Sequence, residues 1–228
     1  MQLRNLVVDG TKLAFREWEG PDDAPVVLLH SLGEDSTTWT RVAAELSQSH
    51  GVYAFDFRGH GASEHTPQYS LELMRDDIQG AIDNLGLSNV ALIGHSLGGM
   101  VAYLVAVQDC HRLTHLVLEE APPPLPVVPA REIPEPPADA LSFDWNAVVA
   151  IYAQRNEPDP RWWGLLSSIK IPTLIIGGGS SSHVDQRQIA RLADQLEACR
   201  VVTIDVGHNV HTARPDEFVA SLTEFLRA

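Results

Sequence analysis

The chain has 228 residues and a mass of 25.0 kDa, a length that suits one domain with one sizeable core. Hydrophobic residues make up 44% of the sequence and charged residues 20%, as is usual for a globular protein. With 16 basic and 30 acidic residues the formal net charge is −14, so we expect neither nucleic acid nor an anionic membrane as a partner, because both bind basic surfaces.

The opening residues, MQLRNLVVDGTKLAF, carry scattered charges and lack the apolar core of a signal peptide. No apolar run has the length needed to span a bilayer. The two cysteines, Cys110 and Cys199, lie far apart and belong to no motif, so we expect free thiols. These features predict a cytoplasmic protein, and they give no indication of its oligomeric state.

Strand and helix patterns alternate along the chain. Two runs around the turn Asp9-Gly10 predict an opening antiparallel pair. Short, continuous apolar runs then predict buried strands at 26–30, 52–56, 90–95, 115–120, 173–178 and 201–205. Amphipathic stretches predict helices at 39–47, 71–85, 97–107, 184–196 and 215–226. This order predicts a doubly wound, mostly parallel α/β sheet of eight strands, in a single domain covering residues 1–228.

Residues 121–163 interrupt this alternation. Their first part, APPPLPVVPAREIPEPP, holds too much proline for a regular helix, whereas FDWNAVVAIYAQ predicts one short helix. We expect this segment to be a small, proline-rich cap over the carboxyl edge of the sheet that adds little to the core. Its tryptophans, Trp145, Trp162 and Trp163, are the expected substrate contacts. Because we find no evident Arg or Lys cluster, they favour a compact, apolar small molecule as the substrate.

The stretch GHSLGG, residues 94–99, follows a predicted strand and opens a predicted helix. It fits the pattern G-x-S-x-G, with Ser96 at its centre. In a strand–turn–helix context this pattern exposes the serine hydroxyl at the end of the sheet, and Gly94 and Gly98 let neighbouring backbone pack close to the turn. The start of the helix also favours negative charge beside Ser96. We therefore expect Ser96 to be a nucleophile.

Two further loops carry a family resemblance. They are HSLGEDSTTW, residues 30–39, and DFRGHGAS, residues 56–63. Together with GHSLGG they make the chain resemble the α/β-hydrolase fold family over essentially its whole length. Within that family it resembles the small esterases, enol-lactonases and cofactor-free haloperoxidases. The resemblance implies an α/β-hydrolase fold and a carboxylic ester hydrolase-like activity that uses no metal and no organic cofactor.

The resemblance also implies roles for individual residues. The main-chain N–H groups of Leu32 and Leu97 match the oxyanion hole, where fixed donors stabilise a tetrahedral oxyanion with little reorganisation. An alternative interpretation is that the two leucines only provide apolar side chains to the wall of the pocket. In VVTIDVGHNVH, His208 matches the general base, and His211 is the second histidine, which usually packs at the edge of such a site.

The acid that would orient His208 is missing from the place where such enzymes often carry it, the turn after strand 173–178. Residues 180–182 of this chain are all serines, which cannot supply a negative charge. Asp185 lies beyond the turn, where we expect it to cap the next helix. Asp205 lies too close to His208 in sequence to reach the far ring nitrogen.

Two glutamates at the end of strand 115–120 are the better candidates. Glu120 matches the position at which some α/β hydrolases, such as the haloalkane dehalogenases, carry the acid, and Glu119 would point to the opposite face. Adjacent buried carboxylates are costly unless each is paired or hydrogen-bonded. We expect Glu120 to complete a triad with Ser96 and His208. Two alternatives stay open: Glu119 in that role, or a Ser-His dyad with both glutamates in solvent.

The sequence thus predicts a serine hydrolase that cleaves a small ester, lactone or related acyl compound through an acyl-enzyme on Ser96. The same residues would also suit a C–C or thioester hydrolase, or a lyase of a biosynthetic pathway, because the cap and pocket determine specificity. A third alternative is a non-catalytic protein of this fold that binds a small ligand and signals to a partner.

Overall fold

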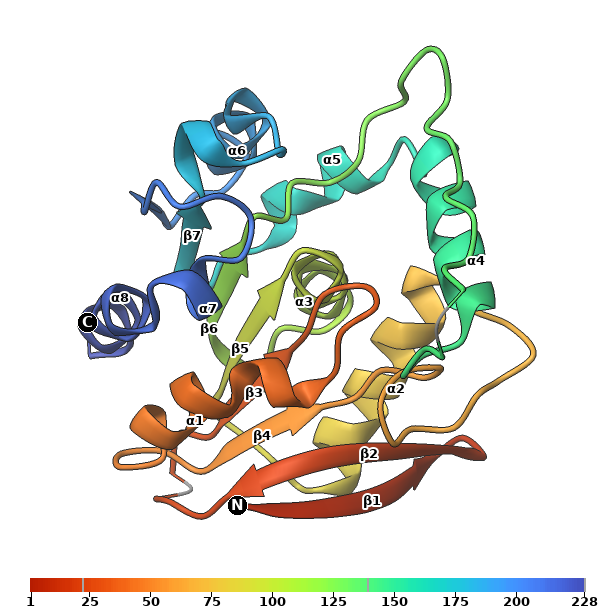
Figure 1. Cartoon of the computed structure of the whole chain (residues 1–228). Helices are drawn as coiled ribbons and strands as arrows, with labels where there is room; N and C mark the ends of the chain where they lie inside the picture. The colour runs from red at the N-terminus through yellow and green to blue at the C-terminus, as the bar shows by residue number, and fades with distance from the viewer. Residues whose placement is uncertain (22, 139, 228) are drawn as a thin grey trace.

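The structure, a computed structural model, describes residues 1–21, 23–138 and 140–227 (Figure 1). Its centre is an eight-stranded sheet with the order β1-β2-β4-β3-β5-β6-β7-β8. The strands are β1 (Gln2–Val8), β2 (Thr11–Trp18), β3 (Val26–Leu29), β4 (Val52–Phe55), β5 (Val90–His95), β6 (Leu113–Glu119), β7 (Thr173–Gly177) and β8 (Cys199–Thr203). The pairs β1–β2 and β2–β4 are antiparallel and all other neighbours are parallel. The predicted mostly parallel sheet of eight strands is confirmed, with strand ends shifted by one or two residues.

Helices cover both faces of the sheet (Figure 1). On one face lie α1 (Thr40–Leu46) and α8 (Pro215–Leu226), and on the other α2 (Leu71–Asn84), α3 (Leu97–Gln108) and α6 (Gln186–Ala193). The strands supply alternate residues to the two sides: Val27 and Leu29 pack with α2 and α3, whereas Val26 and Leu28 pack with α1 and α8. Since both faces of the central strands are buried, their continuous apolar sequence is explained.

Local signals fix where several helices begin. The side chain of Ser70 accepts a hydrogen bond from the main-chain N–H of Leu73 at the start of α2. The expectation that Asp185 caps a helix is confirmed, because it accepts the N–H of Arg187 at the start of α6. Pro215 occupies the first turn of α8, where its missing N–H costs nothing. Among the described residues, no helix is both long and apolar enough to cross a membrane.

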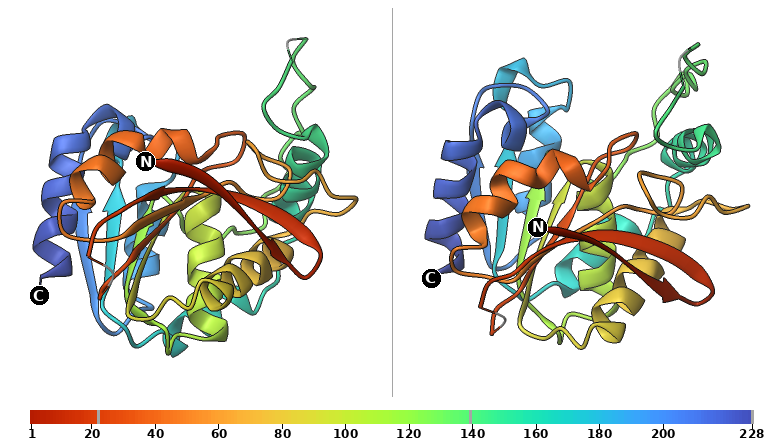
Figure 2. Two further views of the ribbon diagram at one scale, coloured as in Figure 1. Left: turned by 90° about the horizontal axis from the view of Figure 1, so that it is seen from below. Right: turned by 60° about the horizontal axis from the view of Figure 1, so that its bottom comes forward.

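The segment 121–163 has two parts with different packing. The first extends away from the sheet (Figure 2) and is largely exposed over 126–138. The second forms α4 (Trp145–Asn156), as expected, and a short helix α5 (Trp162–Leu165). Ala147, Ile151 and Trp162 are buried in the core on the α2–α3 side of the sheet. The expectation that the segment adds little to the core is therefore wrong for its second part, because α4 and α5 both contribute buried side chains to the core cluster.

Candidate active site

Ser96 stands on a strained turn between β5 and α3. Its backbone has φ 52° and ψ −109°, in the half of conformational space that residues other than glycine rarely adopt. A Cβ atom on Gly94 would lie 2.2 Å from the carbonyl oxygen of Gly98, and one on Gly98 would lie 2.2 Å from the carbonyl oxygen of Leu29. The two glycines of the motif are thus required by close backbone contacts beneath the serine.

Leu97 and Leu32 are the residues whose main-chain N–H groups we expect to form an oxyanion hole. Leu97 is the first residue of α3, so its N–H has no partner within the helix, and Leu32 belongs to the loop after β3. Within the described residues neither main-chain N–H donates a hydrogen bond. The Leu97 side chain is buried and that of Leu32 packs against the core, so their apolar packing does not compete with a role for their main chain.

A cavity of about 430 Å³ opens beside Ser96. Glu120 and His208 share its wall with Ser96, so the structure brings the three expected catalytic residues together from β5, β6 and the loop after β8. No hydrogen bond joins Ser96 to His208 in the described part of the chain; such contacts are often long without substrate. The remaining lining residues are Met100, Ala121, Pro122, Pro124, Arg131, Tyr152, Arg155, His183, Val184, Asp185 and Gln188.

The Glu120 carboxylate lies in a cradle of hydrogen-bond donors. It accepts the main-chain N–H of Gly178 at 2.5 Å, the side-chain amide of Gln186 at 3.0 Å and the hydroxyl of Ser182. One of its oxygens lies 3.4 Å from Nδ1 of His208. Burial alone would raise the pKa of Glu120, but these donors, with His208 foremost, outweigh it and lower the pKa. Glu120 is therefore an ionised acceptor facing His208.

The turn after β7 supplies hydrogen-bond donors to carboxylates from other parts of the chain. Ser182 binds Glu120, whereas Ser180 and the main chain of Ser181 bind the exposed carboxylate of Asp205. Asp185 pairs with Arg187 at the start of α6. Neither aspartate faces His208 among the contacts of the described residues.

Glu119 makes a second, separate pair. It is completely buried and binds His211 twice, at 2.9 Å to the main-chain N–H and at 2.8 Å to Nδ1. Burial would raise the pKa of Glu119, but the charges of His211 and His95 lower it. With Glu119 0% and Glu120 2% exposed, the alternative in which both glutamates lie in solvent is wrong.

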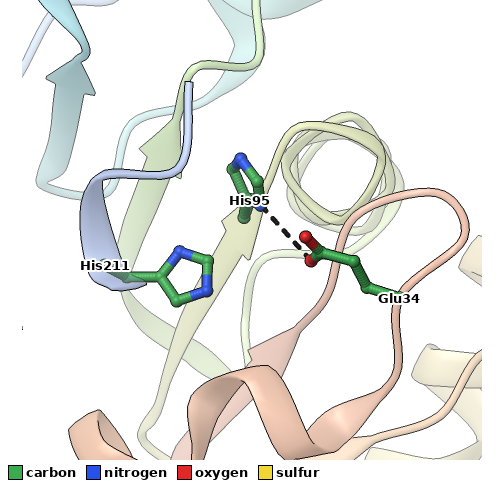
Figure 3. A group of neighbouring side chains, drawn as sticks. All are labelled: Glu34, His95 and His211. Atoms are coloured by element: carbon green, nitrogen blue, oxygen red, sulfur yellow. Dashed lines mark ion pairs between the residues drawn. The ribbon is translucent and has the colours of Figure 1, made fainter. Parts of the chain in front are cut away.

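Near Ser96, the half-buried Glu34 and the buried His95 and His211 form a polar cluster (Figure 3). Nδ1 of His95 lies 3.7 Å from the Glu34 carboxylate, and Nε2 of His95 lies 3.0 Å from the carbonyl oxygen of His208. Burial opposes the charge of His95, but Glu119 and Glu34 raise its pKa above the ordinary value. The cluster thus ties together the loop after β3, the end of β5 and the loop that carries His208.

The same cluster contains the atoms that best match a cation site. One ligand atom from each of its three residues lies within 4.8 Å of the others. Glu34 lies beside His95, and Glu119 binds His211.

The three tryptophans assigned to the substrate are not among the residues that line the cavity. Trp162 is buried in the core, Trp163 stacks beneath the Arg191 guanidinium at 4.3 Å, and Trp145 lies near Phe143. Trp162 and Trp163 pack α5 against the core. This assignment is corrected: Tyr152, Arg155 and Arg131 are the residues of the segment 121–163 that reach the cavity beyond its first prolines.

Sequence reasoning also missed His183, whose ring centroid lies 4.3 Å from that of His208. Burial, and then the nearby His208, lower the pKa of His183. The signal was available in the turn after strand 173–178, because the ends of parallel strands meet at one edge and bring following loops together.

Comparisons with known proteins agree with this architecture. Residues 26–221 match the model of the alpha/beta hydrolase family. The sn-1-specific diacylglycerol lipase ABHD11 of Mus musculus is 26% identical over 260 residues, covering 94% of this chain and 85% of that protein. A putative esterase/lipase of Haemophilus influenzae is 25% identical over 249 residues, covering 93% of this chain and 86% of its own.

Solved structures resemble the whole chain. A hydrolase from Pseudomonas aeruginosa PA01 superposes with a TM-score of 0.85 at 25% identity, covering 99% of this chain and 98% of the other. The enol-lactonase from Burkholderia xenovorans LB400, at 23% identity, has a TM-score of 0.83 and covers 99% of this chain and 100% of its own, a likeness of fold.

Proposed function

The chain belongs to the alpha/beta hydrolase family, and from this membership we propose that it is a serine hydrolase that cleaves a small carboxylic ester or lactone through an acyl-enzyme on Ser96. One observation carries the proposal. Ser96 on its strained turn and His208 beside the ionised Glu120 line the same cavity, although they come from three separate parts of the chain. We further propose that residues 121–163 act as the cap of that single domain.

The proposed reaction has two halves. Ser96 Oγ attacks the carbonyl carbon and its proton passes to Nε2 of His208, while Glu120 keeps the Nδ1 proton in place. The N–H groups of Leu32 and Leu97 bind the oxyanion. The tetrahedral adduct then expels the alcohol, which takes the proton from His208. Water, deprotonated by His208, attacks the acyl-enzyme, releases the acid and restores Ser96.

Glu120 suits its part because its charge is fixed before the reaction begins. A carboxylate with a lowered pKa stays ionised at neutral pH and stabilises the imidazolium that forms on His208. The hydrogen bond of 3.0 Å from His95 to the His208 carbonyl supports the same loop from behind. Glu120 therefore holds the ring of His208, and His95 holds its main chain.

A direct test uses p-nitrophenyl acetate together with an organophosphonate probe. We expect turnover of the ester and addition of the probe's mass to the peptide that contains Ser96, with both lost in Ser96→Ala. Ser180→Ala, an exposed serine bound to Asp205, is the matched control and should retain both. Unchanged labelling of Ser96→Ala, or absence of any turnover by the wild-type protein, would count against the proposal, the latter favouring a ligand-binding role.

A further inference from the structure

Two arginines from the segment 121–163 reach the cavity that contains Ser96. Arg131 precedes α4 and Arg155 lies in its last turn, and both line the cavity wall. The chain as a whole carries a formal net charge of −14. A pair of guanidinium groups in this cavity is therefore a local exception to the charge of the molecule.

Neither guanidinium has a carboxylate partner among the described residues. Most other arginines of the chain do; the pairs include Arg4–Glu17, Arg41–Asp216, Arg58–Asp77, Arg112–Asp83, Arg161–Asp159 and Arg200–Glu224. Among the described residues, the Arg131 guanidinium donates only to the carbonyl oxygens of Arg155, at 2.9 Å, and Leu125, at 3.4 Å. Arg155 lies over the ring of Tyr152 at 5.7 Å, and its Nε is buried without an acceptor.

Two guanidinium groups without a carboxylate partner among the described residues are unfavourable neighbours in a partly buried wall. Burial, and then the neighbouring charge of Arg131, lower the pKa of Arg155, which shows that its positive charge is poorly compensated. The two carboxylates in the cavity wall are engaged elsewhere: Glu120 with its donor cradle and Asp185 with Arg187. An incoming anion would satisfy the unpaired donors.

The pair is also held in place before any ligand arrives. The Asn156 side chain binds the main chain of Arg131 through two hydrogen bonds of 2.9 Å, one to its N–H and one from the amide to its carbonyl oxygen. The Arg131 guanidinium in turn binds the carbonyl of Arg155 near the end of α4. Such prior positioning lowers the ordering cost of binding.

We propose that Arg131 and Arg155 form an anion subsite that binds a carboxylate on the substrate while its ester or lactone carbonyl lies at Ser96. The inference rests on the proposed hydrolase function and names its substrate class: a short acyl compound with a second, free carboxylate. Guanidinium groups bind carboxylates through paired, charge-assisted hydrogen bonds, which gives both affinity and orientation. A substrate with a free carboxylate replaces the apolar substrate that we expected from the sequence.

The test compares matched esters that differ by one charge. The monomethyl and dimethyl esters of succinate, glutarate and adipate share the reacting methyl ester, and methanol release reports on each. We expect the wild-type protein to have a kcat/KM at least about tenfold higher for one monoester than for its diester. This ratio should fall about tenfold to a hundredfold in Arg155→Met and in Arg131→Met. Arg200→Met, which removes an exposed arginine paired with Glu224, should keep the ratio.

The outcomes separate the two proposals. Equal kcat/KM for monoesters and diesters would overturn the anion subsite while leaving the hydrolase in place, whereas no hydrolysis of any ester and no phosphonate labelling would overturn the hydrolase itself. A measurement on the wild-type protein avoids dependence on folding of the variants. Glutarate should inhibit diester hydrolysis competitively and better than glutaramide at equal ionic strength. Stronger inhibition by inorganic phosphate than by glutarate would overturn the assignment to a carboxylate.

Discussion

Glu119 and Glu120 are neighbours in sequence that bind two different histidines after β8: His211 in the short helix α7 (Val210–Ala213) and His208 in the loop before it. Glu119 ends β6, and Glu120 follows it with φ 52°, which turns its carboxylate toward His208 while Glu119 faces His211. Both contacts brace the segment after β8, one from the cavity side and one from the core. Two buried carboxylates are tolerated here because each has hydrogen-bond donors of its own.

The first prediction concerns the charge of Glu120. Glu120→Gln keeps the shape of the side chain but removes the negative charge that stabilises a protonated His208, so kcat should fall by about a thousandfold or more with a smaller change in KM. Steady-state kinetics with p-nitrophenyl acetate provide the measurement. Asp205→Asn, which neutralises an exposed carboxylate bound to Ser180, should stay near wild type. A Glu120→Gln enzyme with nearly full activity would mean that the site works as a dyad.

The second prediction concerns the pH dependence of stability, which follows from the lowered pKa of Glu34. Burial opposes its charge, but His95 foremost lowers the pKa of Glu34 from 4.5 to about 2. The stability that ionised Glu34 contributes is therefore present above pH 4.5 and lost as the pH falls through about 2. The stability that protonated His95 contributes is present below pH 6.5 and lost as the pH rises through its raised pKa. The pair should stabilise the fold most between these limits.

The matching experiment is thermal unfolding of Glu34→Gln against the wild type. We expect the deficit in Tm to be largest near about pH 5.5 and to shrink at about pH 3. Glu45→Gln is the control, because Glu45 is exposed on α1 and contacts only Gln48 among the described side chains. A deficit that stays constant over this range would show that Glu34 stabilises by packing alone.

At the scale of elements, the β5–α3 unit is the best example of local sequence fixing local structure. Gly94 and Gly98 allow contacts that any Cβ would block, and α3 is buried on all sides, which explains its almost wholly apolar sequence. This is also why the motif around Ser96 was readable from the sequence. The turn is specified by residues within a few positions of one another.

Gly98→Ala tests this unit. The new Cβ would clash with the Leu29 carbonyl, so we expect the free energy of unfolding to fall by about 1–3 kcal/mol or more, measured by urea denaturation. Gly164→Ala provides the control within α5, where a Cβ meets open space and alanine favours the helix. Equal stability of both variants would contradict the close-contact argument.

Elements that depend on distant partners were harder to predict. The alternation of apolar runs predicted the strands and the main helices, and position after a strand predicted Glu120, His208 and Ser96 as neighbours. Nothing near Trp145, Trp162 or Trp163 distinguishes a pocket wall from a core contact, because that depends on where α4 and α5 pack. The arginine pair was missed for the same reason, since its members are separated by 24 residues and meet only at the end of α4.

At the scale of the whole molecule, the segment 121–163 is divided between surface and core. Residues 132–138 are exposed, whereas Ala147, Ile151 and Trp162 belong to the core on the α2–α3 side. The second part of the segment thus belongs to the folded body, even though it also forms part of the cavity wall. Its removal would expose the apolar surface that it covers.

Two variants test the contributions of the exposed part and the buried part to stability. Replacing 132–138 with a short glycine-serine linker should change Tm by no more than about 2 °C, because the free energy of loop closure depends only weakly on loop length. Trp162→Ala should destabilise the protein by about 3–5 kcal/mol, since it removes a large, buried side chain. Differential scanning calorimetry measures both. A strong loss of stability on trimming 132–138 would contradict the division.

The cradle around Glu120 has a consequence for how the site depends on the sheet. Its donors Gly178 and Ser182 belong to the turn after β7, whereas Glu120 itself follows β6. Glu120 is thus placed by β6 and held by the turn after β7, so the position of its carboxylate depends on both strands.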